Sequence, residues 1–169
     1  MDISNSVQSL GGDNFRVDGQ TIDFETLILS VQTQRANLLE SQLADQAQEI
    51  QKRNDMIAKV NDMLNEAKNV GARSTDTNPS TGSAALRQFL VDNKIPFGNG
   101  GNPLTLLRGE WDAVAQGLKN LTDKLNSQSQ MDMIRLQSLM NKRDQAFEMM
   151  TNVLQKTSKL NGDIVANMR

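Results

Sequence analysis

The sequence contains no cysteine and no histidine. The chain therefore cannot form disulfides, and it lacks a thiolate nucleophile, an imidazole base and the usual zinc ligands. Two carboxylate pairs remain, Asp62 with Glu66 and Asp144 with Glu148, each one helical turn apart. They lie beside Lys and Arg, which is typical of a solvated helix face. We therefore expect no enzymatic activity, no cofactor and no metal.

Charge and hydropathy point to neither nucleic acid nor a membrane. The 18 basic and 20 acidic residues are scattered along the 169-residue chain, without a basic block that could follow a phosphate backbone. No apolar run approaches the ~20 residues of a membrane-spanning helix. The first residues also lack the basic and apolar regions of a Sec signal peptide. We expect a cytoplasmic protein, unless another secretion route operates.

Heptad spacing of apolar residues predicts a first long helix over 22–70. Asn54 falls near its apolar face, where it either sets the alignment of the helices or points to the edge of the face. The face is formed by Ala36, Leu39, Leu43, Ala47, Ile50, Ile57, Val60, Leu64 and Ala67.

The heptad pattern is absent over 71–102. The stretch GARSTDTNPSTGS predicts a loop, and Ser83 can cap a short helix, AALRQFLVDN, that ends before Pro96. The glycine-rich FGNGGNP lacks the Lys-Ser/Thr pair of a phosphate-binding P-loop, so we interpret it as a connector.

A second long helix is predicted over 103–169, with Asn102 as N-cap and Pro103 at its first position. Its heptads change phase by one residue after the polar stretch NSQSQ, which indicates a bend or a local change of supercoil. The first face is Leu107, Trp111, Val114, Leu118, Leu121 and Leu125; the second is Met133, Leu136, Met140, Phe147, Met150, Leu154, Leu160, Ile164 and Met168.

These segments predict an all-α fold, a long antiparallel two-helix coiled-coil hairpin. At 1.5 Å per residue the helices would measure roughly 70 and 100 Å, too long for a compact domain of this size. Residues 71–102 would form a small outward-facing insertion of a loop and a short helix, and residues 1–21 a flexible arm. Apolar residues surround more than one side of each helix, so we expect identical copies to assemble.

The stretch SQSQMDMIRLQSLMNKRDQAFEMMTNVLQK, with the ending ANMR, resembles the terminal helix of the EspA/SseB-like proteins, which form the filamentous tip of bacterial type III secretion needles. The order of segments is also similar: a Ser/Asn-rich arm, a first helix LILSVQTQRANLLESQLADQAQEIQKRNDMIAKVNDMLNEAK, and a middle FLVDNKIPFGNGGNPLTLLRGEWDAVAQGL. The middle is short for this family. The resemblance implies that the helices pack into a hollow helical tube with the middle segment outside.

By this resemblance the protein would be a secreted structural subunit on the bacterial surface. It would polymerise into a conduit that carries secreted proteins towards the host cell and supports the translocon. Its partners would be other copies, a cytoplasmic secretion chaperone before export, the needle subunit and translocator proteins. Residues 1–21 would carry the export signal, although a disordered arm would have the same composition. A cytoplasmic coiled-coil adaptor or secretion-chaperone-like module that forms small closed oligomers is the alternative.

We expect one set of apolar residues to form the coiled-coil or subunit interface. The resemblance assigns Met133, Leu136, Leu139, Met140, Phe147, Met150 and Leu154 to the terminal helix face, and Ile28, Val31, Leu38, Leu39 and Leu43 to its first-helix counterpart. The heptads add Ile50, Ile57, Val60, Leu64, Leu118, Leu121, Leu125 and Ile164.

Overall fold

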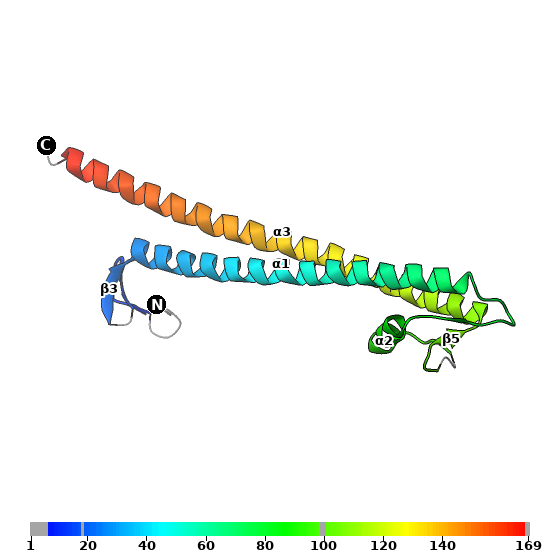
Figure 1. Ribbon diagram of the computed structural model, residues 1–169. Helices are drawn as coiled ribbons and strands as arrows, with labels where there is room; N and C mark the ends of the chain where they lie inside the picture. Colours follow the sequence, from blue (N-terminus) through cyan, green and yellow to red (C-terminus); the bar gives the residue numbers. More distant parts are fainter. Residues whose placement is uncertain (1–6, 18, 99–100, 168–169) are drawn as a thin grey trace. The chain divides into compact units, whose positions relative to one another are not determined.

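The computed structural model describes residues 7–17, 19–98 and 101–167, with side chains up to Lys159. It is mostly helical, with two long antiparallel helices, as predicted (Figure 1). The elements are β1 (Gln8–Ser9), β2 (Asn14–Val17), β3 (Gln20–Asp23), α1 (Phe24–Gly71), β4 (Ser80–Thr81), α2 (Ala84–Asp92), β5 (Thr105–Leu106) and α3 (Arg108–Asn167).

The contacts divide the chain into two compact units. Unit 1 contains residues 1–47 and 135–169, and unit 2 contains residues 48–134. Each long helix contributes one portion to each unit. Within each unit the α1 portion packs antiparallel against the α3 portion.

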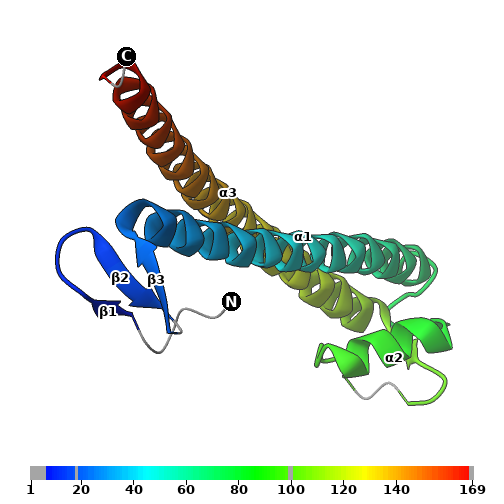
Figure 2. The same cartoon turned by 90° about the vertical axis from the view of Figure 1, so that its left-hand side faces the viewer.

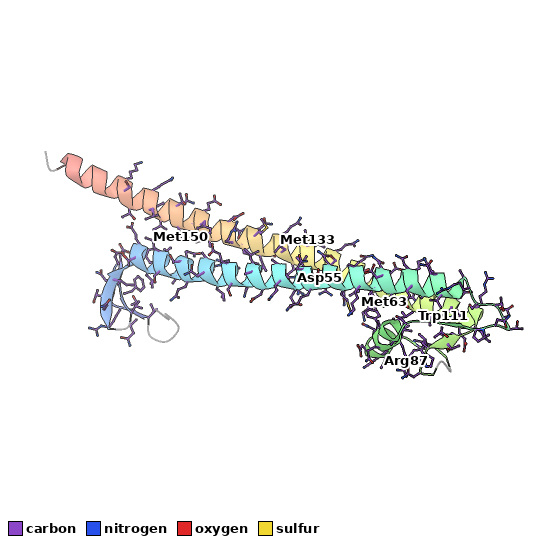
Figure 3. All side chains as sticks on the ribbon, in the orientation of Figure 1. Asp55, Met63, Arg87, Trp111, Met133 and Met150 are labelled. Atoms are coloured by element: carbon purple, nitrogen blue, oxygen red, sulfur yellow. The ribbon has the colours of Figure 1, made fainter. Side chains whose placement is uncertain are left out.

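Unit 2 holds a continuous apolar core between α1, α2, β5 and α3, with α2 and β5 lying beside the two helices (Figure 1). Ser83 caps α2 as predicted, because its Oγ accepts a 3.0 Å hydrogen bond from the Leu86 N–H. Trp111 is 1% exposed. A Cβ at Gly71 or Gly82 would lie 2.9 or 2.6 Å from its side-chain atoms, so these glycines let the backbone approach the indole ring (Figure 3).

The predicted start of the second helix at residue 103 is wrong. Helix α3 begins at Arg108, and β5 pairs antiparallel with β4 just before it. Leu104 and Leu106 are each 1% exposed, so their burial in the core overrides the capping signal of Asn102 and Pro103. The Leu107 N–H instead donates a 3.0 Å hydrogen bond to Glu110 Oε2 in the first turn of α3.

The predicted arm 1–21 contains strands in its described part, which the sequence did not predict. Strands β1, β2 and β3 form an antiparallel three-stranded sheet that leads into α1 (Figure 2). Gly11, Gly12 and Gly19 have φ of 87°, 64° and 82°, which suit the turns between the strands. Residues 1–6, where an export signal would begin, lie outside the described residues.

Helix α1 starts within two residues of the predicted position. Asp23 Oδ1 accepts a 2.6 Å hydrogen bond from the Thr26 N–H and so caps the helix. This hydrogen bond holds the pKa of Asp23 below its ordinary value of 3.8. The sequence has no proline or glycine between this cap and Gly71, so nothing local interrupts the helix.

Candidate functional site

The fully buried positions of the helix–helix interface in unit 1 are mostly small or polar side chains. Ala36, Leu39, Gln32 and Gln46 of α1 and Ala146 of α3 are at most 8% exposed. Gln32 Oε1 is buried without a hydrogen-bond partner among the described residues. Ala47, predicted on this face, is exposed, and Gln46 takes its place. The fully buried positions of this interface therefore contribute little apolar surface.

The α3 residues that face α1 in unit 1 include part of the predicted set, namely Leu136, Leu139 and Met150, whereas Ala146 and Val153 lie there next to Phe147 and Leu154. Thr33 Oγ1 donates to Met150 Sδ at 3.5 Å, and Thr157 Oγ1 donates to Glu25 Oε2 at 2.5 Å. The buried or half-buried α3 residues recur in steps of three and four. They are Leu136, Leu139, Arg143, Ala146, Met150, Val153 and Thr157.

Large apolar side chains of α3 are left outside this interface, and three of them are regularly spaced. Met140, Phe147 and Leu154 are 41%, 43% and 55% exposed and lie seven residues apart. Each directly follows an interface residue, so they form one line beside the interface. We call these three residues the α3 row. In unit 1 these residues lie beside the α1–α3 contact, and their role at a coiled-coil or subunit interface stays a prediction.

Helix α1 carries a comparable line. Phe24, Val31 and Leu38 are 47%, 42% and 60% exposed and also lie seven residues apart; we call them the α1 row. Val31 and Leu38 lie beside the α1–α3 contact, and their expected role at a coiled-coil or subunit interface stays a prediction. Phe24 was missed, although its spacing from Val31 was visible in the sequence.

The two rows lie on opposite sides of the helix pair in unit 1. Members of the α1 row directly precede interface residues, whereas members of the α3 row directly follow them. Each residue turns an α-helix by roughly 100°. In antiparallel helices a residue before the interface on one helix and a residue after it on the other therefore point to opposite sides. Met150 of the interface, labelled in Figure 3, lies between Phe147 and Leu154 in the sequence of α3.

The remaining predicted interface residues fall into groups. In unit 1, Leu39 is buried, and Ile28, Leu43, Leu136, Leu139 and Met150 are half-buried; the side chain of Ile164 lies outside the described residues. In unit 2, Val60, Leu118 and Leu125 are buried, Ile50, Ile57, Leu64 and Leu121 are half-buried, and Met133 is 46% exposed.

A polar layer crosses the α1–α3 interface of unit 2. Arg53 Nε donates to Asp132 Oδ2 at 2.6 Å, and Arg53 Nη1 donates to Gln128 Oε1 at 2.8 Å. The side chain of Asp132 is 9% exposed. Asn54 is exposed, so the interpretation that places it at the edge is confirmed, and Arg53 takes the interface position. A buried polar layer fixes the alignment of paired helices.

The carboxylates of the two pairs from the sequence are hydrogen-bonded, ion-paired or exposed in the structure. Glu66 Oε1 accepts a 2.9 Å hydrogen bond from the Ser83 N–H, and Asp144 Oδ1 pairs with Arg143 Nη2 at 2.8 Å. Asp62 and Glu148 are exposed. Among the described side chains, no cluster of three or more acidic residues is arranged to hold a metal ion.

No protein-family model, curated protein or solved structure matches this chain. Within the described ranges, no helix is long and apolar enough to cross a membrane. The exposed rows of unit 1 are the candidate functional surface.

Proposed function

We propose that this protein is a structural subunit that assembles with identical copies through the exposed apolar rows of unit 1. The observation that carries the proposal is the α3 row, whose Met140, Phe147 and Leu154 are 41–55% exposed along one line. Large apolar patches on a protein surface usually mark a partner. Their seven-residue spacing suits another helix as that partner, because a helix in a left-handed coiled coil repeats every seven residues.

The composition of unit 1 supports an assembling subunit over a self-contained domain. Its own interface contains Gln32, Gln46, Ala36 and Ala146 at positions that leucine or isoleucine usually fills in stable coiled coils. Burying a Leu, Phe or Met side chain contributes about 1.5–3 kcal/mol. Burying the exposed rows in a second copy would therefore add apolar burial that unit 1 lacks alone.

We extend this proposal to the tip filament of a type III secretion needle. Its support is the resemblance of residues 127–156 to the terminal helix of EspA/SseB-like proteins, together with the helical hairpin. In this role the chain would be exported by a type III system and form a hollow extracellular conduit towards the host cell. Its other partners would be a cytoplasmic chaperone, the needle subunit and the translocator proteins.

Negative-stain electron microscopy of the purified chain over a concentration series tests self-assembly. We expect fibres of uniform width above a threshold concentration. Phe147→Asp should abolish them, because a charge in an apolar contact loses its hydration, whereas Phe147→Leu should retain them. Small particles of one size at every concentration would contradict an open polymer and favour the closed oligomer of an adaptor.

Export is tested separately in a bacterium that carries a type III system. We expect the tagged chain in the culture medium of the parent strain and its retention in cells that lack the export ATPase. Phe147→Asp should still be exported, because export carries the unfolded chain. Retention of the parental chain in both strains would contradict the secretion role and leave self-assembly standing.

A further inference from the structure

We propose that the α1 row of one copy docks on the α3 row of a second copy, so that the copies join head to tail. This inference rests on the proposed self-assembly and adds which two surfaces meet. The contact joins Phe24, Val31 and Leu38 of one chain to Met140, Phe147 and Leu154 of the next.

The rows match in length and spacing. Each has three exposed apolar side chains at intervals of seven residues, so both cover the same number of helical turns. Two helices that cross at a shallow angle keep such positions aligned over this length. The central residues are Val31 and Phe147, so a small side chain meets a large one in either direction of docking, which favours close packing.

The docking surface continues an interface that already exists in the chain. The members of the α3 row directly follow Leu139, Ala146 and Val153, which pack towards α1 of the same copy. A helix laid on this row would therefore extend the α1–α3 interface into a bundle, as occurs when heptads show apolar residues at more than two positions.

Charges beside the two rows are complementary. Arg35 is exposed and lies between Val31 and Leu38, and Asp144 is exposed and lies between Met140 and Phe147. Within its own chain Asp144 contacts Arg143, which is half-buried, so the more accessible charge at this point is the carboxylate. Arg35 comes beside Asp144 when the docked helix runs antiparallel to α3, and this sets the direction of docking.

The positions of the rows make the contact heterologous. Because they lie on opposite sides of the helix pair, a copy that docks its α1 row keeps its α3 row free for another copy. Contacts of this kind generate rings or open polymers, in contrast to the closed pair formed by one self-complementary patch. A fibre would then grow by repetition of this one contact.

Sedimentation velocity on full-length variants tests the inference. Val31→Asp blocks the α1 row and Phe147→Asp blocks the α3 row, and each alone should raise at least tenfold the concentration at which species larger than a monomer appear. Each variant retains the row that the other has lost. An equimolar mixture should therefore form a 1:1 dimer that does not grow further. Ser41→Asp and Asn152→Asp, exposed positions outside the rows, should assemble like the parent.

Several outcomes would overturn the inference and separate it from the proposed function. If Val31→Asp assembles like the parent while Phe147→Asp does not, the α3 row pairs with itself, and self-assembly stands without this docking. If the mixture forms no dimer at concentrations where the parent assembles, the proposed docking is wrong, but self-assembly still stands. A parent that stays monomeric overturns the self-assembly itself.

A charge exchange gives a second test that needs no loss of apolar surface. Arg35→Glu and Asp144→Arg should each weaken assembly three- to tenfold, because each places like charges together in the antiparallel contact. The chain that carries both changes should regain most of the parental assembly. Additive losses in the double variant would contradict the proposed direction of docking.

Discussion

Unit 2 and unit 1 draw on the same two helices but bury different kinds of side chain. Unit 2 surrounds Trp111, Leu86 and Leu118, each at most 1% exposed, with further apolar residues from α2 and β5. Unit 1 buries Gln32 and Ala146 at its interface and leaves Phe147 43% exposed. This difference underlies our proposal that the apolar residues in the core of unit 2 stabilise the single chain, whereas the exposed rows of unit 1 contact a partner.

The largest difference between the units is expected from truncating their big aromatic residues. Trp111→Ala should lower the free energy of unfolding by about 3–5 kcal/mol, because it leaves a cavity in a closed core. Phe147→Ala should change it by no more than about 0.5 kcal/mol, because the side chain is at the surface. Urea unfolding followed by circular dichroism, below the assembly threshold, measures both. Similar losses of unfolding free energy in both variants would contradict the contrast between the packed core of unit 2 and the exposed rows of unit 1.

The next largest loss of stability is expected from a side chain added beside Trp111. A Cβ at Gly82 would come within 2.6 Å of Trp111 Cη2. Gly82→Ala should therefore destabilise the chain by about 1–3 kcal/mol. Gly109→Ala is the matched control, because nothing lies within 4 Å of its Cβ, and it should stabilise α3 slightly. Thermal unfolding of both variants checks this; an unchanged Gly82→Ala would mean that the core of unit 2 has spare room.

The polar layer of unit 2 should show a smaller effect that depends on pairing. Asp132→Ala leaves Arg53 without its 2.6 Å partner in a largely buried place and should cost about 1–2 kcal/mol. Replacing both, as Arg53→Met with Asp132→Leu, should recover most of this loss, because no unpaired charge remains. Urea titrations of the single and the double variant measure both free energies of unfolding. A double variant as unstable as Asp132→Ala would contradict the argument that the unpaired charge causes the loss.

The smallest effect is expected at the start of α1 in unit 1. The pKa of Asp23 is held below 3.8 by the hydrogen bond from Thr26, so its ionised form is favoured in the folded chain. The stabilisation is present above pH 3.8 and is lost as the pH falls through the lowered pKa. NMR titration of the Asp23 carboxyl carbon checks this. Asp23→Asn should keep the cap without the pH dependence, and a pKa of 3.8 or above would contradict it.

The elements with strong local signals were predictable. The two long helices follow from sustained heptads, and the short helix follows from Ser83 before an apolar run. Strands β2 and β3 were missed, although Asp18-Gly19 in the sequence is a strong hairpin signal between NFRV and QTID. The arm has few apolar residues, so the sequence showed no alternating apolar pattern that would have predicted these strands.

Hydrophobicity alone could not predict which side of α3 faces α1. The heptad pattern predicts the large residues Met140 and Phe147 at the interface. In the structure the neighbouring residues Leu139 and Ala146 pack towards α1 instead. A small residue such as alanine lets helices approach closely, so the interface residue need not be the most hydrophobic. The start of α3 was misplaced for a related reason, since burial of Leu104 outweighs a local cap signal.

Hydrogen exchange of the intact chain below and above its assembly concentration compares the two units within one molecule. We expect backbone amides of 24–38 and 140–154 to exchange more slowly at the higher concentration, because a second copy covers both rows and suppresses local opening. Amides of 56–125 in unit 2 should exchange equally at both concentrations. Slowing confined to unit 2, or none in either row of a chain that assembles, would show that other surfaces join the copies.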